Sequence, residues 1–169
     1  MQLIFIRHGH YDKKLHKTRA ERDRAPLSAE GEADARRAGT YLGEHAIRPD
    51  FVLHTATERT RQTAALVLEE LGVTGRPTIN VGTTFRNFDG LARKLARWSA
   101  QHGIPDESVV FLVGHGSTQD ALRKCFTGDA LPPTADESHG AWLELFVGPG
   151  QAPRAGGFFV GRLKNEVTA

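Results

Sequence analysis

The sequence predicts an α/β fold in which helices cover both faces of a largely parallel sheet. The runs Leu3–Ile6 and Val109–Val113 are short, rich in β-branched and aromatic residues, and lack polar alternation. Strands buried on both faces have this composition. Segments with helical periodicity separate the strand candidates through most of the chain, which is the pattern of a three-layer α/β/α sandwich.

In the first half of the chain, each helix candidate has a recognisable start. After the strand Leu3–Ile6, a helix is expected over about Ala29–His45, with Ser28 as its N-cap. The strand Phe51–His54 leads into a helix over about Ala56–Leu71. The pattern Thr55-x-x-Glu58 predicts a capping box at the start of that helix.

In the second half, Thr78–Val81 is a weaker strand candidate. A helix over about Gly90–His102 places Leu91, Leu95 and Trp98 on one face, and another is expected at about Thr118–Phe126 after the strand Val109–Val113. The end of the chain differs from the rest. Two segments flank a Gly/Pro-rich stretch there and predict an antiparallel pair at a sheet edge: Ala141–Val147 and Gly157–Leu163.

Length and composition favour one ordinary globular domain spanning residues 1–169. The formal charge of +2 is too small to indicate a nucleic-acid partner, and the single cysteine, Cys125, excludes an internal disulfide. No secretory signal or membrane-length apolar run is visible. We therefore expect a cytoplasmic protein with no nucleic-acid or membrane partner. The oligomeric state cannot be inferred from the sequence.

Charge is concentrated between Asp12 and Arg24, where six Lys or Arg residues stand against three acids. Two interpretations remain open for this segment. It is either a solvated surface loop or a surface that recruits anionic ligands.

Three short motifs follow predicted strands: Arg7-His8-Gly9, Thr55 to Arg59, and Gly114-His115-Gly116. In an open parallel sheet, the loops at the carboxyl ends of strands face one crevice, where ligands bind. That crevice would collect two arginines and two histidines. Such a set indicates a site that holds and transfers a phosphoryl group.

The chemistry of these residues fits phosphoryl transfer. Arg7 and Arg59 can pair bidentately with phosphate oxygens, and the start of the helix after Thr55 adds backbone N–H groups. His8, kept neutral by nearby cations, can act as a nucleophile. His115 can donate a hydrogen bond to the phosphoryl oxygens and stabilise developing charge.

Four motifs in order resemble those of the histidine phosphatases, the phosphoglycerate-mutase-like superfamily, in the short branch 1 form. They are Arg7-His8-Gly9 after a strand, Leu27-Ser28-x-x-Gly31, Thr55-x-x-x-Arg59-Thr60-x-x-Thr63, and Gly114-His115-Gly116. The resemblance covers most of residues 1–147. It implies a phosphoglycerate-mutase-like fold, His8 as the nucleophile, and a phosphate site made of Arg7, His8, Arg59 and His115. It implies neither a cofactor nor a metal, and the histidines of this chain form no convincing metal-ligand set.

The sequence also departs from the family. After Arg-His-Gly, this chain has His10 and Tyr11 where mutases and sugar-bisphosphatases usually have Glu or Gln and then Ser or Thr. Those enzymes carry a Glu after the third strand as general acid and base. The corresponding loop, Gly82–Gly90, has no Glu and only one carboxylate, that of Asp89. Asp89 is the candidate acid, and the alternative is an N-cap or first-turn residue of the following helix.

The leading functional prediction is a metal-independent phosphatase that forms a phosphohistidine on His8. Its substrate would be a phosphorylated small molecule or a phosphohistidine protein. In lacking this Glu, the chain is similar to the SixA-type phosphohistidine phosphatases. A phosphohistidine substrate needs no strong acid, because its imidazole leaves easily. Two alternatives are a phosphoryl-transferring mutase and a phospho-ligand binding module with little turnover.

Overall fold

A computed structural model describes residues 1–82, 88–118, 142–146 and 154–159. For the last two strands and for residues 88, 89, 91 and 92, the description covers the backbone alone. Most of the predicted helix Thr118–Phe126, with Cys125, lies outside the described residues.

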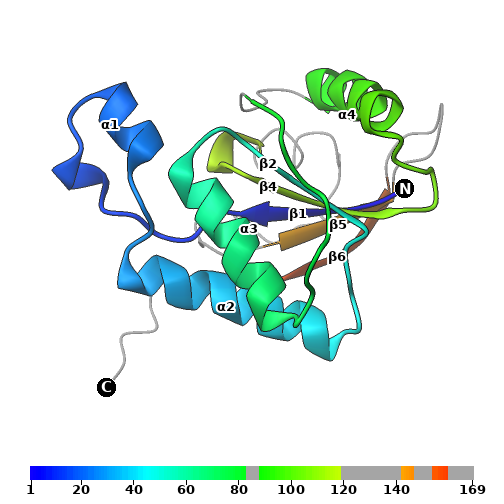
Figure 1. Cartoon of the computed structure of the whole chain (residues 1–169), viewed down its shortest axis with the longest axis horizontal. Helices are drawn as coiled ribbons and strands as arrows, with labels where there is room; N and C mark the ends of the chain where they lie inside the picture. The colour runs from blue at the N-terminus through cyan, green and yellow to red at the C-terminus, as the bar shows by residue number, and fades with distance from the viewer. Residues whose placement is uncertain (83–87, 119–141, 147–153, 160–169) are drawn as a thin grey trace.

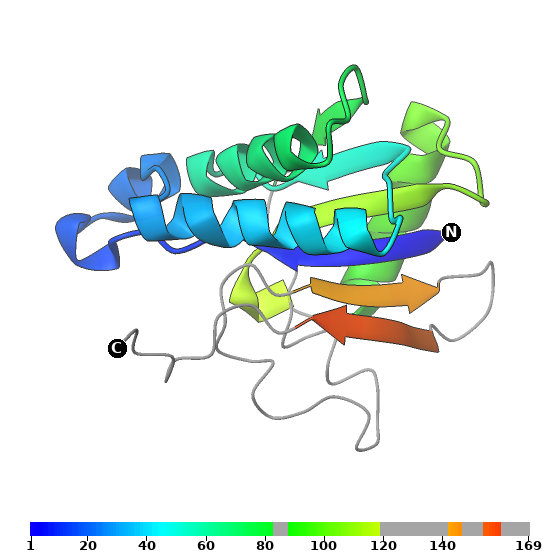
Figure 2. The ribbon, with the colours of Figure 1, turned by 90° about the horizontal axis from the view of Figure 1, so that it is seen from below.

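The described strands form a six-stranded sheet in the order β3-β2-β4-β1-β5-β6, which Figure 2 shows nearly face on. The first four strands in this order are mutually parallel, whereas β5 is antiparallel to β1 and β6 is antiparallel to β5. Their bounds are β1 (Gln2–Arg7), β2 (Phe51–His54), β3 (Thr78–Asn80), β4 (Val109–Gly114), β5 (Trp142–Phe146) and β6 (Arg154–Phe159).

The strand register brings the three motif loops to the same edge of the sheet. Arg7, the last residue of β1, lies opposite Gly114, the last residue of β4. His54, the last residue of β2, lies opposite Val113. The segments that follow these strands therefore leave the sheet side by side, as the parallel arrangement requires.

Helices cover both faces of the sheet, which confirms the predicted three-layer α/β/α architecture (Figure 1). Helices α2 (Ala29–Glu44) and α3 (Glu58–Glu70) pack on one face, and α4 (Phe88–His102) packs on the other. Successive residues of β1 divide between the two cores. Leu3 and Phe5 join Leu95 and Trp98 of α4, while Ile4 and Ile6 face α2 and α3. This two-sided burial explains the unbroken apolar runs in the sequence.

The helix starts confirm one capping prediction and correct another. Ser28 is the N-cap of α2, and its Oγ accepts a hydrogen bond from the Gly31 N–H. The predicted capping box at Thr55 and Glu58 is wrong, because α3 begins two residues later than predicted, with Thr57 as N-cap. The hydroxyl of Thr55 bonds to Thr60 and His115 instead, so tertiary contacts take the group that the local pattern assigned to the cap.

The charged segment after β1 has regular structure that the sequence interpretation did not include. A 3-10 turn, η1 (Lys13–Leu15), precedes a short helix, α1 (Arg19–Arg24), beyond the carboxyl end of β1 (Figure 1). A true capping box starts α1, formed by Thr18 and Glu21. Among the described residues, no helix is both long and apolar enough to span a membrane.

Candidate active site

The loop after β1 begins with His8, whose backbone is held at the sheet edge. Its N–H donates to the carbonyl of Gly114 at 3.0 Å, which continues the β1–β4 ladder by one residue. The next N–H, of Gly9, donates to Thr63 Oγ1 at 3.1 Å. Thr63 lies in α3, and its hydroxyl also donates to the Arg59 carbonyl at 2.8 Å. One α3 side chain thus fixes the turn that carries His8.

Two motif glycines allow this loop to lie against the first turn of α2. A Cβ atom placed on Gly9 would stand 2.1 Å from the carbonyl oxygen of Gly31, and one placed on Gly31 would stand 2.0 Å from the carbonyl oxygen of His10. Both distances are far below contact distance, so any side chain at either position would force the backbones apart. Gly9 and Gly31, which belong to two separate motifs of the family resemblance, are therefore spatial neighbours.

The other side of the loop is held by polar groups of α2. Ser28 makes three hydrogen bonds to His10. Its backbone N–H and its hydroxyl donate to the His10 carbonyl at 3.0 and 3.2 Å, and its Oγ lies 2.8 Å from the His10 Nδ1. The His10 N–H donates to the carboxylate of Asp34 at 3.4 Å. Asp34 is only 2% exposed and accepts a hydrogen bond from Arg37. Burial raises the pKa of Asp34, while Arg37 acts in the opposite direction.

The hydrogen bonds of the His8 ring define its tautomer. Arg59 Nε, which can only donate, lies 3.3 Å from His8 Nε2. The opposite nitrogen, Nδ1, lies 2.7 Å from the carbonyl oxygen of Gly9, which can only accept. The ring of His8, 5% exposed, therefore carries its proton on Nδ1 and a lone pair on Nε2.

Arg59 connects both histidines to the segment after β1. It lies in the first turn of α3 and is 7% exposed. Its NH2 group lies 3.3 Å from His115 Nδ1, its NH1 group donates to the carbonyl of Arg22 in α1, and its guanidinium stacks 4.5 Å from the centre of the Tyr11 ring. Burial lowers the pKa of Arg59 from its ordinary value, yet an arginine this basic stays charged.

His115 completes the cluster directly after β4. Its ring centre is 4.9 Å from that of His8, and its Nε2 lies 3.0 Å from Thr55 Oγ1. Because Arg59 donates to Nδ1, the proton of a neutral His115 belongs on Nε2, where it is donated to Thr55. Burial, with the charges of Arg59 and Arg7, lowers the pKa of His115 to about 4.

The guanidinium of Arg7 lies close to His115 and the glycine that follows it. A Cβ atom on Gly116 would stand 3.4 Å from the Arg7 Cζ atom, so the small residue after His115 leaves room for this guanidinium. The structure thus brings together all four residues of the predicted phosphate site. Two permanent cations and two imidazoles around one point can hold a doubly charged tetrahedral anion.

Other predicted residues lie elsewhere or outside the description. Asp89 lies in the first turn of α4, and its side chain is not among those described. His54, the last residue of β2, is buried, with Nδ1 2.9 Å from the Thr55 carbonyl. Within the described part of the chain, no three His, Cys, Asp or Glu side chains gather in a way that could hold a metal ion.

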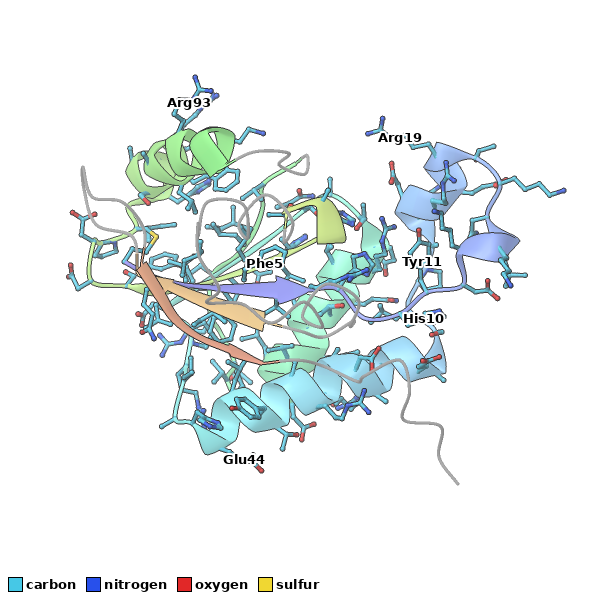
Figure 3. The ribbon with its side chains drawn as sticks, turned by 180° about the vertical axis from the view of Figure 1, so that it is seen from behind. Phe5, His10, Tyr11, Arg19, Glu44 and Arg93 are labelled. Carbon is cyan, nitrogen blue, oxygen red and sulfur yellow. The ribbon has the colours of Figure 1, made fainter. Side chains whose placement is uncertain are left out.

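Sequence reasoning missed several residues that build the site. Tyr11 packs against Arg59 and makes an edge contact with His8 at 5.8 Å between ring centres, and it lies with His10 beyond the tip of β1 (Figure 3). Thr55 was assigned to a cap, and Asp34 was not singled out. The apolar-in, polar-out pattern of α2 offered one signal, because Asp34 falls on the buried face of that helix.

The family model described as histidine phosphatase superfamily (branch 1) matches residues 3–88. A curated 2,3-bisphosphoglycerate-dependent phosphoglycerate mutase from Azorhizobium caulinodans is 35% identical over 77 residues, which are 46% of this chain. The match spans 37% of the mutase, little more than a third of its length.

Two solved structures are similar over nearly their whole length. One is a proposed phosphohistidine phosphatase, SixA, from Agrobacterium tumefaciens, with a TM-score of 0.69, 21% identity, and coverage of 94% of this chain and 96% of that one. The other is the protein histidine phosphatase SixA complexed with tungstate, with a TM-score of 0.69, 16% identity, and coverage of 95% and 97%. At these identities, the likeness establishes the fold.

Proposed function

Because the chain belongs to the histidine phosphatase superfamily (branch 1), we propose that it is a metal-independent phosphatase working through a phosphohistidine on His8. One observation supports this above the others. The Arg59 and Gly9 contacts hold His8 as the tautomer whose Nε2 lone pair lies beside a cation. This nitrogen is the one that would attack the phosphoryl group.

In the first step, His8 Nε2 attacks phosphorus, a P–N bond forms, and the bond from phosphorus to the leaving group breaks. The imidazole gains positive charge, which the Nδ1–H bond to the Gly9 carbonyl stabilises. Arg7 and Arg59 offset the charge on the equatorial oxygens. To do so, Arg59 turns N–H groups from its protein acceptors to the phosphoryl oxygens.

His115 supplies a second donor once the anion is bound. In the free site its low pKa leaves it uncharged at neutral pH, between two arginines. A phosphoryl dianion offsets those cations and raises the pKa of His115. The Nδ1 atom then takes up a proton and donates to a phosphoryl oxygen, while Thr55 holds the ring through Nε2.

In the second step, water attacks the phosphohistidine, the P–N bond breaks, and phosphate leaves with His8 restored. Asp89 remains the candidate that protonates an ester leaving group in the first step. A phosphohistidine substrate needs less help, because imidazole is a better leaving group than an alkoxide. The substrate we propose is accordingly a phosphomonoester with a good leaving group or a phosphohistidine protein.

A second candidate function, phosphoryl transfer between positions of one substrate, is favoured by the likeness to a mutase over 77 residues. Incubation with a diphosphorylated sugar acid separates the two. A mutase retains the phosphoryl group on the product, and a phosphatase releases it to water.

The test of the proposal is phosphate release from an aryl phosphate in the presence of a metal chelator. We expect His8→Ala to abolish turnover and to abolish an acid-labile, base-stable phosphoprotein trapped by rapid quenching. His45→Ala is the matched control, because His45 is an exposed histidine at the end of α2, and it should leave both signals unchanged. Turnover that survives in His8→Ala would disprove the mechanism.

A further inference from the structure

The segment from Asp12 to Arg24, called the basic arm below, carries a charge opposite to that of the remaining chain. Its six cations and three acids give it a formal charge of +3, whereas the whole chain carries +2. The remainder of the protein is therefore slightly negative. All of the net positive charge resides on 13 residues that directly follow the β1 loop.

The acids of the arm bind backbone N–H groups or Arg19, and none of them forms an ion pair with a lysine of the arm. The Asp12 carboxylate accepts the Lys14 N–H at 3.0 Å, and that of Glu21 accepts the N–H groups of Lys17 and Thr18 at 2.8 and 2.9 Å. Asp23 pairs with Arg19 at 3.8 Å. Among the described residues, no ion pair forms at Lys13, Lys14 or Lys17, and all three side chains are exposed.

An apolar group stands in the middle of these charges. Leu15 is 74% exposed and is the single large hydrophobic residue exposed among the described side chains. An exposed apolar anchor within a charged rim is typical of surfaces that bind other proteins. A nucleic acid would instead favour a continuous basic surface without interspersed acids.

The arm is tied to the candidate active site through its backbone. The carbonyl of Arg22 accepts a hydrogen bond from Arg59, the arginine that also contacts both histidines. At the other end of the arm, the chain enters from Tyr11, which packs on the same guanidinium. Figure 3 shows the arm beside the end of β1, so a protein bound to the arm would lie next to His8.

We infer that the basic arm is a docking surface for an acidic face of a protein that carries the phosphoryl group, with Lys13, Lys14 and Lys17 pairing its carboxylates. This inference rests on the proposed phosphatase function and specifies its substrate class. The arm raises the local concentration of an acidic phosphoprotein at His8, and it does not take part in the chemical step.

The test uses two histidine-phosphorylated peptides of equal length, made with a phosphoramidate donor. One has Asp and Glu around the phosphohistidine, and the other has Asn and Gln. We expect kcat/KM of the native protein to favour the acid-flanked peptide about tenfold, through KM, and the preference to shrink as salt is raised.

The arm variant combines Lys13→Gln, Lys14→Gln and Lys17→Gln, and the matched control combines Arg48→Gln, Arg76→Gln and Arg97→Gln, three exposed cations elsewhere. The arm variant should lose most of the preference, and the control should keep it. Aryl phosphate turnover should be the same in all three proteins, which also shows that the arm variant is folded.

Each result has a definite consequence. A native protein without preference, or an arm variant that keeps it, overturns the docking inference while His8-dependent turnover leaves the phosphatase proposal intact. Competition by a single-stranded oligonucleotide that depends on the arm, without peptide preference, overturns it in favour of nucleic acid. If neither peptide nor aryl phosphate is turned over, the proposed function fails. Docking is then measured as binding of the acid-flanked peptide to the native protein and to the arm variant.

Discussion

The loop from Arg7 to His10 and the basic arm are neighbours in sequence but are held in opposite ways. The loop is fixed on every side, by the Gly9–Gly31 contact, by Thr63, by Ser28 and by the buried carboxylate of Asp34. The arm has no buried residue in either of its helical turns and carries its own capping box. Positioning a nucleophile requires many contacts from the interior, whereas attracting a charged partner requires exposure.

The largest effect is expected at Arg59, the side chain that contacts both regions. Arg59→Lys replaces the planar guanidinium by a single ammonium group. An ammonium cannot contact His8, His115 and the Arg22 carbonyl at the same time. We expect kcat/KM for an aryl phosphate to fall about 100- to 1,000-fold. Arg61→Lys is the control, since Arg61 lies on the exposed side of the same helix and pairs with Glu58. Retention of more than about a tenth of the activity in Arg59→Lys would argue against its role in stabilising charge.

The next largest effect is expected at Gly31 of α2, and Gly43 of the same helix serves as the comparison. Gly31→Ala would press a methyl group onto the His10 carbonyl, so we expect the free energy of unfolding to fall by about 1–3 kcal/mol and kcat to fall with it. At Gly43, an added Cβ would meet Leu71 Cδ2 at 3.5 Å, an ordinary contact. Gly43→Ala should stabilise the protein by about 0.5–1 kcal/mol. Denaturant unfolding measures the free energy of unfolding of both variants. Equal changes in the two would show that the contact between Gly31 and His10 does not hold the loop from Arg7 to His10.

The pKa of His115 predicts how stability depends on pH. In the native state the pKa is about 4, against an ordinary value of 6.5, so between these values the unfolded chain binds a proton that the native protein does not. The free energy of unfolding should therefore fall as pH is lowered from 6.5 to 4, by about 2–3 kcal/mol from this group. In His115→Gln the dependence over this window should be shallower by that amount. Identical slopes would mean that His115 titrates normally.

The smallest effects compare two N-caps. Ser28→Ala removes bonds to Gly31 and to His10, so it should lower the global free energy of unfolding by about 1 kcal/mol and reduce kcat. Thr18→Ala removes the cap of α1, an exposed six-residue helix. We expect faster amide hydrogen exchange at residues 20–24 with a global change below about 0.5 kcal/mol. Loss of global stability in Thr18→Ala equal to that in Ser28→Ala would contradict the difference between the two regions.

Local patterns failed where a side chain had two possible partners. Thr55-x-x-Glu58 has the pattern of a capping box, yet the Thr55 hydroxyl bonds to His115, which is 60 residues away in sequence. The pattern Thr18-x-x-Glu21 lies within the charged segment Asp12–Arg24 and does form a capping box. The local sequence does not distinguish the two patterns. Thr55 bonds to a residue that is distant in sequence, whereas Thr18 is exposed and bonds to the nearby Glu21.

The sequence alone determined the alternation of strands and helices, the family, and the set of residues at the strand ends. Buried parallel strands have a distinctive composition, and parallel topology places the following loops at one edge. Only the tertiary structure decided that Gly9 contacts Gly31, that Asp34 and Thr63 hold the loop, and that Arg59 joins both histidines to the basic arm. These are contacts between segments separated by about 20 to 60 positions. Their geometry depends on the packing of whole helices, which no local pattern encodes.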